Sequence, residues 1–142
     1  MGRTVVALIV TALLAAPAAA EIGTVKKAVG AATVLRGKAV LPAQPGTRLD
    51  VGDTLVTGKD GRIAVTFIDN TRFALGPNSR VVVNRFDFDD ATHQGHFDAK
   101  VLKGQLAVIS GQIAHENPKG MTLQTPTSVL GIRGTRFVVA VR

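Results

Sequence analysis

The sequence predicts an all-β fold, a single compact sandwich or roll built from short antiparallel strands and hairpins. Three observations predict it. Runs rich in Val, Ile, Thr and Phe alternate between apolar and polar residues, which is the period of two that a half-buried strand requires. Glycine occurs 15 times in 142 residues and separates these runs at short intervals. After residue 21 no stretch carries an apolar stripe of helical period over three turns.

Four runs show the alternation most clearly. The residues expected on their buried faces are Ile63, Val65 and Phe67 in the first, Val82, Phe86 and Phe88 in the second, Phe97, Ala99 and Val101 in the third, and Phe137, Val139 and Val141 in the last. The runs 80–88 and 97–103 flank the polar residues 89–96, which predicts a hairpin with a medium-length loop. Tight turns are expected at 59–61 and 76–79, where Gly, Pro and Asn supply the backbone angles that turns need.

A short internal echo follows these runs. Gly-Gln-Leu-Ala at 104–107 returns as Gly-Gln-Ile-Ala at 111–114, seven residues later. We expect the same turn-and-strand unit at both places. The echo is too short to indicate a solenoid.

Residues 1–20 have the three-part pattern of a secretory signal peptide. Arg3 supplies a positive start, an apolar run follows, Pro17 interrupts it, and three alanines precede Glu21. An uncleaved membrane anchor is the alternative, but the apolar run is short for a span. We therefore expect cleavage of a Sec-type signal after Ala20, no stable membrane anchor afterwards, and one periplasmic or secreted domain over 21–142.

Composition excludes several classes of protein. Cysteine is absent, which removes disulfides, thiolate metal sites, iron–sulfur clusters, cysteine nucleophiles and lipoprotein anchors. Trp and Tyr are also absent, which argues against stacking platforms for sugars and nucleic acids. The net charge is +7, or +6 once Arg3 is removed with the signal peptide. The basic residues are scattered, as on solvated strand faces, although an exported cationic protein also attracts anionic envelope polymers.

Catalytic motifs are missing from the sequence. Ser110 has no Gly-x-Ser-x-Gly frame, and His115 is an isolated residue beside a loop. No paired carboxylates, phosphate-binding loop or metalloprotease spacing is found. We expect neither an enzyme nor a cofactor.

One cluster of acidic and imidazole side chains could bind Ca²⁺, Zn²⁺ or iron. It comprises Asp87, Asp89, Asp90, His93, His96 and Asp98, of which Asp89, Asp90, His93 and His96 are the possible ligands. Two histidines three residues apart suit a helix better than a hairpin loop, and the spacing of a Ca²⁺ loop is not met. The favoured interpretation is a solvated loop whose acids neutralise basic strands.

A second candidate site is the run Arg133, Gly134, Thr135 and Arg136. Its two arginines could bind a carboxylate or phosphate in a bidentate manner. The favoured alternative is structural, with a tight chain reversal at the glycines. In that interpretation Arg133 caps carbonyl groups or pairs with an interior acid such as Asp53 or Asp69.

An ordered set of segments resembles the signatures of FecR-type domains, from about Gly23 to the end of the chain. The segments are 52–58 (GDTLVTG), 64–71 (AVTFIDNT), 75–79 (LGPNS), 102–106 (LKGQL), 110–114 (SGQIA), 125–127 (TPT) and 131–137 (GIRGTRF). The resemblance implies an extracytoplasmic all-β module. The positions expected to form its structural turns are Gly52, Asp53, Gly58, Gly76, Pro77, Asn78, Gly104, Gly111 and Gly131.

The best-known members of that family are transmembrane regulators of iron-uptake signalling. They join a cytoplasmic anti-sigma segment to a periplasmic domain that senses a receptor. In this sequence a signal-peptide pattern stands where such a segment would be, so we expect a stand-alone binding or scaffold module. Its expected partner is an envelope protein or an anionic envelope polymer, without nucleic acid. The alternatives are a periplasmic protein that binds a small ligand or metal, and a structural envelope protein.

Overall fold

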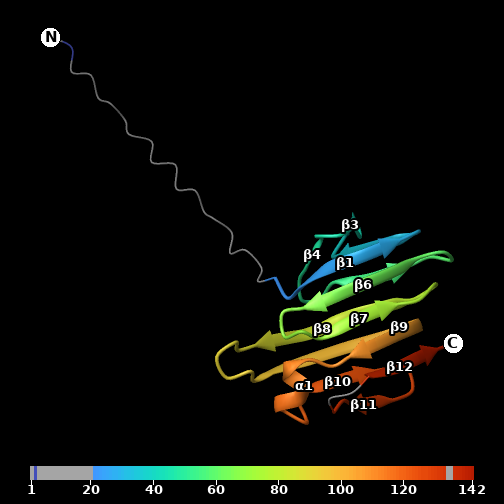
Figure 1. Cartoon of the computed structure of the whole chain (residues 1–142). Coiled ribbons are helices and arrows are strands. Elements are labelled where there is room, and N and C mark those ends of the chain that lie inside the picture. The colour runs from blue at the N-terminus through green and yellow to red at the C-terminus, as the bar shows by residue number, and fades with distance from the viewer. Residues whose placement is uncertain (1, 3–20, 134–135) are drawn as a thin grey trace.

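The computed structural model describes Gly2, residues 21–133 and residues 136–142, and the described chain forms a curled β-sheet (Figure 1). The rest of the predicted signal peptide, together with Gly134 and Thr135, lies outside the described residues. The elements are β1 (Gly23–Val29), β2 (Ala32–Arg36), β3 (Ala39–Pro42), β4 (Arg48–Leu49), β5 (Thr54–Thr57), β6 (Arg62–Phe67), β7 (Arg72–Leu75), β8 (Arg80–Phe88), β9 (Gly95–Ile109), α1 (Gln112–Glu116), β10 (Met121–Gln124), β11 (Val129–Gly131) and β12 (Arg136–Val141). The all-β prediction is confirmed.

The long strand β9 connects the two halves of the sheet. Its N-terminal part pairs with strands of one half and its C-terminal part with strands of the other. Its residues 95–103 pair with β8, and part of the same stretch pairs with β10; this half continues to β11 on one side and through β5 and β2 to β3 on the other. Its residues 104–109 pair with β12 and, in part, with β7, and that half continues through β6 and β1 to β4. Among the described strands, every pairing is antiparallel except that of β9 with β10. Because β9 spans both halves, the sheet curls around the core as in a roll.

Phenylalanine rings from both halves meet in that core. Phe67 and Phe73 come from one half, and Phe86 and Phe97 from the other. The ring centroids of Phe67 and Phe97 are 4.7 Å apart and those of Phe86 and Phe97 4.9 Å apart, both pairs in edge-to-face contact. Such pairs add about 0.5–1.5 kcal/mol to the burial of their area. The apolar positions predicted by alternation in 62–68, 97–103 and the last run do face this core.

The buried face predicted for the run 80–88 is partly wrong. Val81 and Val83 are fully buried, whereas Val82 is only half-buried. The register between β8 and β9 shifts between Val83 and Arg85, so one extra residue enters the strand there. A β-bulge of this kind reverses the alternation, which returns Phe86 to the core after two exposed residues.

The predicted repeat of a turn and strand at 111–114 is also wrong. The first copy lies in β9, but the second forms α1, a helix of five residues. Gly111 sits against the turn between β6 and β7, and the amides of Gln112 and Ile113 donate to Asp69 at that turn. These contacts end the sheet and start a helical turn. No helix in the described part of the chain has the length and apolarity of a membrane span.

Candidate functional site

Three of the signature segments meet at Ser79, which is fully buried. Its amide donates to Thr57 Oγ1 at 2.9 Å, and the Thr57 hydroxyl donates to the carbonyl oxygen of Gly76 at 2.7 Å. The Gln105 amide donates to Ser79 Oγ at 3.0 Å. Gly104 has a φ of +89°, and a Cβ added there would stand 2.2 Å from Ser79 Oγ. These segments therefore hold β5, β8 and β9 together, and we call this group the Ser79 tie.

A second group of buried hydrogen bonds, which we call the Asp69 tie, joins the β6–β7 turn to the start of α1. The Asp69 side chain is fully buried, and its carboxylate accepts hydrogen bonds from the Thr71 amide (3.0 Å), the Thr71 hydroxyl (2.7 Å) and the Ile113 amide (3.3 Å). The Gly111 amide donates to Thr71 Oγ1 at 3.1 Å. A Cβ on Gly111 would lie 2.3 Å from the Asp69 carbonyl oxygen, so the close approach requires glycine.

Asp53 and Arg36 form a bidentate pair that sequence reasoning missed. Arg36 Nε donates to Asp53 Oδ1 at 2.9 Å, and the guanidinium also donates to Oδ2 at 2.7 Å. The hydrogen bonding to Asp53 is the main reason that the pKa of Arg36 is raised. Burial lowers this pKa, and the charges of Asp53 and Asp50 raise it further. The cation that the structure places beside Asp53 is Arg36. Arg36 ends β2 and Asp53 lies directly before β5, and nothing local in the sequence links these two positions.

Most other predicted turn positions do lie at turns or close contacts. Gly52 lies in a turn with a φ of +90°, Pro77 and Asn78 form the turn between β7 and β8, and Gly58 packs against Ala31. The prediction of a turn at Gly131 is wrong, because this residue pairs with Thr122 in β11.

The predicted metal ligands do not converge. Asp89 accepts hydrogen bonds from the amides of Ala91 and Thr92, which close the loop, and the His93 ring stacks on Phe88. Asp98 accepts a hydrogen bond from the Thr122 hydroxyl. In the described ranges, no three His, Asp or Glu side chains are grouped so that they could hold a metal ion.

Asp87 and His96 instead belong to an exposed polar cluster on the β8–β9 hairpin. Arg85 Nε donates to Asp87 Oδ2 at 3.1 Å, and His96 Nδ1 lies 3.3 Å from Asp87 Oδ1. Desolvation is the largest single influence and would raise the pKa of Asp87, but the hydrogen bonds from His96 and Arg85 and the charges of these two residues together outweigh it and lower the pKa. The cluster stabilises the hairpin locally.

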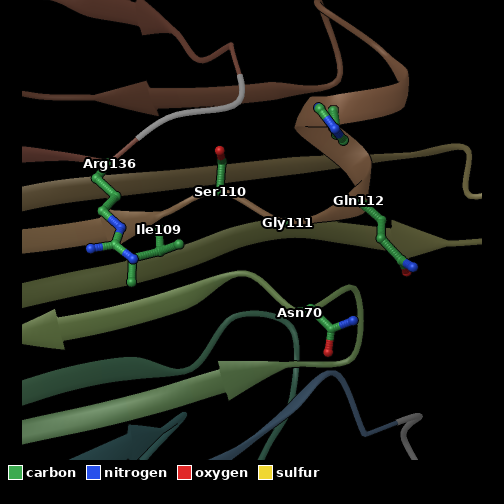
Figure 2. A pocket seen from close by; sticks show the side chains of 7 residues that line it. Asn70, Ile109, Ser110, Gly111, Gln112 and Arg136 are labelled. Carbon is green, nitrogen blue, oxygen red and sulfur yellow. The ribbon is translucent and has the colours of Figure 1, made fainter.

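Arg136, from the second predicted site, lines a groove of about 340 Å³ that we call the Arg136 groove (Figure 2). The lining residues are Asn70, Ile109, Ser110, Gly111, Gln112, His115 and Arg136. They come from the β6–β7 turn, the end of β9, α1 and the start of β12, so the groove forms only when these elements meet. The sequence did not identify Asn70 and Gln112 as lining residues. The φ of Asn70, +69°, is typical of a turn and does not indicate a binding site.

The chemistry of the Arg136 groove suits an anion. Its lining offers a guanidinium, two carboxamides and an imidazole, and none of the described residues that line it carries a carboxylate. Ser110 and His115 also line this groove. The arrangement fits carboxylate or phosphate binding.

A second groove runs along the other end of β12, and we call it the edge groove. It measures about 410 Å³ and is lined by Thr125, Pro126, Thr127, Ser128, Leu130, Val139, Ala140, Val141 and Arg142. One wall is β12 and the other is the β10–β11 hairpin. Figure 1 shows these strands at one margin of the molecule, beside the C-terminus. Both grooves therefore lie along β12.

The fold and these grooves together define the class of protein. It is an all-β domain in which buried polar contacts join the strands and two grooves lie along one edge strand. The family model described as FecR protein matches residues 53–142. More than half of the chain is covered, so the chain belongs to the FecR family, and the resemblance seen in its segments is confirmed. Comparison with the curated proteins and with the solved structures found no match.

Proposed function

We propose that this chain is a periplasmic binding module that recognises a protein of the cell envelope within a sensory or signalling system, without catalysis. Membership of the FecR family and the signal-peptide pattern of residues 1–20 support the location and the context. The single observation that carries the binding role is the state of β12.

β12 is an edge strand that the described residues leave open. It pairs with β9 and with no other described strand, and Val138 at its middle is 69% exposed. Native proteins normally protect such an edge with a proline, an inward charge or a covering element. β12 has six residues with no proline, and its charged residue, Arg136, stands at its start. An open apolar edge of this length is suited to docking a protein segment.

The Arg136 groove favours a second candidate function, the binding of a small anionic ligand. The reason is the hydrogen-bond donors of its lining, together with the lack of a carboxylate among the described lining residues. Citrate and inorganic phosphate are suitable probes, because a ligand that binds only the folded state must raise the melting temperature. A rise that Arg136→Gln removes would favour the small-ligand function.

Photo-crosslinking in intact cells tests the proposed function. A photoreactive amino acid replaces Val138, and the matched control replaces Val40, which is 65% exposed on β3, an end strand that pairs with β2 and is not adjacent to β12. We expect an adduct with an envelope protein from position 138 and none from position 40. Equal labelling from both positions, or none from either under several growth conditions, would contradict the proposal. Co-sedimentation with isolated envelope that fades as salt rises would indicate an anionic polymer instead.

A further inference from the structure

The hydrogen-bonding directions along β9 show which backbone N–H and C=O groups of β12 can pair with a further strand. The Gln105 carbonyl accepts a hydrogen bond from the Gly76 amide at 3.0 Å, so the backbone groups of Gln105 point toward the β7 side. In an antiparallel ladder the hydrogen-bonding direction alternates from one residue to the next. The backbone groups of Leu106 and Val108 therefore point toward β12.

The opposite register positions on β12 are Val139, facing Leu106, and Phe137, facing Val108. These two residues make the hydrogen bonds to β9. The residues between and beside them direct their N–H and C=O groups to the open edge; they are Arg136, Val138 and Ala140. The side chains of these three residues are exposed on the outer face, so neither the core nor the β9 ladder depends on them.

The edge groove gives an added strand a place to lie. Leu130 on β11 and the loop 125–128 stand opposite the C-terminal half of β12. The lining combines small hydroxyl side chains on the loop 125–128 with apolar ones such as Ala140 and Val141. Side chains of moderate size at alternate positions of an added strand would fit against it.

The charges along β12 favour an occupant with negative charge. Arg136 stands at its start and Arg142 directly after its end, and Lys103 lines a further groove with Arg142. No acidic side chain of the described residues lies within ion-pair distance of these three cations. A second copy of this chain is disfavoured, because antiparallel pairing centred on Val139 would place Arg136 opposite Arg142 and both copies are strongly basic.

We propose that β12 accepts an extended acidic segment of the partner protein as an added strand, an inference that rests on the proposed function. Main-chain hydrogen bonds form with Arg136, Val138 and Ala140. Apolar residues at alternate positions of the segment contact the edge groove, and carboxylates at its two ends pair with Arg136 and Arg142. Backbone pairing supplies the affinity, and the charges supply the selection of partner.

Val138→Pro is the direct test of strand addition. Proline removes the N–H that faces the open edge but no hydrogen bond to β9, and edge strands tolerate it. Val138→Thr is the matched control, since it keeps the N–H at the same exposed position. The probes are two fluorescein-labelled peptides, Glu-Val-Thr-Val-Thr-Val-Glu and the same peptide with Lys for Glu, followed by fluorescence anisotropy at low salt with the full chain.

We expect the Glu peptide to bind the unchanged protein and Val138→Thr alike, and to bind Val138→Pro about tenfold more weakly, as the loss of a backbone hydrogen bond implies. The Lys peptide should not bind. The double variant Arg136→Glu with Arg142→Glu changes exposed residues, so it should fold, release the Glu peptide and bind the Lys peptide. Equal binding of the Glu peptide to Val138→Pro and Val138→Thr, or binding of neither peptide to any variant, would overturn the inference.

Crosslinking separates this inference from the proposed function. With the photoreactive residue at Ala140, the envelope adduct should disappear in the Val138→Pro background and persist in the Val138→Thr background. An adduct that persists in both keeps the proposed function and overturns strand addition. No adduct even with Val138 unchanged counts against the proposed function itself. Concentration-dependent dimers that Val138→Pro abolishes would identify a second copy as the occupant and overturn the acidic segment.

Discussion

Two glycines of the family signature differ in their surroundings: Gly104 is closely packed, whereas the space around Gly131 is open. A Cβ on Gly104 would stand 2.4 Å from the Cα of Ser79, and the backbone there has a φ of +89°. A Cβ on Gly131 meets no atom of the described residues within 4 Å, and its φ is not in the positive range. Both glycines belong to the segments that mark the family, yet glycine is physically required at only one of them.

The difference separates structural residues from residues available for recognition. The Ser79 tie and the Asp69 tie use signature residues to join strands that are distant in sequence. Along β11 and β12 the chain instead leaves side chains and backbone groups exposed, Val129 and Val138 among them. Partner specificity should therefore depend on the C-terminal edge, and stability on the ties.

The largest expected effect comes from Gly104→Ala. The methyl group would overlap Ser79 and the residue would hold a strained φ, so we expect the free energy of unfolding to fall by about 3 kcal/mol or more. Urea denaturation measures it. Gly46→Ala is the matched control, because Gly46 has a φ of +95° but open space around its Cβ, and it should cost only about 1 kcal/mol. Equal costs for the two variants would show that contact with Ser79 imposes no constraint.

Asp69→Ala should have the next largest effect. It leaves the Thr71 hydroxyl and the Ile113 amide without their buried acceptor, at a cost of about 2–3 kcal/mol. Hydrogen exchange at the Ile113 amide should accelerate more than exchange in β2 on the opposite half. Asp60→Ala removes an acceptor at an exposed turn and should change stability by less than about 0.5 kcal/mol. A similar loss in both variants would argue against the Asp69 tie.

Local pattern predicted much of this fold, and the misses have physical causes. Alternation placed Ile63, Val65 and Phe67 on the core face because that strand is regular. It failed at Val82, since a bulge is set by the pairing with β9 and leaves no mark in the local sequence.

The candidate site was predicted less well than the fold. Arg136 was found from its own motif, but its neighbours Asn70 and His115 come from other elements, and only the folded chain brings them together. The pair of Arg36 with Asp53 was missed for the same reason. Contacts between distant segments therefore lie beyond what periodicity can predict.

A smaller effect is expected at the exposed hairpin, and it depends on pH. The pKa of Asp87 is lower in the folded protein, so its contribution to stability is present above the ordinary carboxyl pKa of about 4 and is lost as the pH falls through the lowered value. Asp87→Asn should lower the melting temperature slightly at pH 6 and not at pH 2. Asp90→Asn, which removes a carboxylate from the loop of the same hairpin, is the matched control. A constant difference at both pH values would mean that charge is not the cause.

Gly131→Ala should have the smallest effect and is the sharpest test of the comparison with Gly104. The added methyl group enters open space on a strand whose backbone suits any L-residue, so the free energy of unfolding should change by less than about 0.5 kcal/mol. The measurement is the same urea denaturation, performed beside Gly104→Ala, so that one substitution is compared in two segments of one family signature. A loss at Gly131 as large as that at Gly104 would mean that the C-terminal edge is as constrained as the interior. In that case, partner recognition would have to be assigned to another part of the surface and not to this edge.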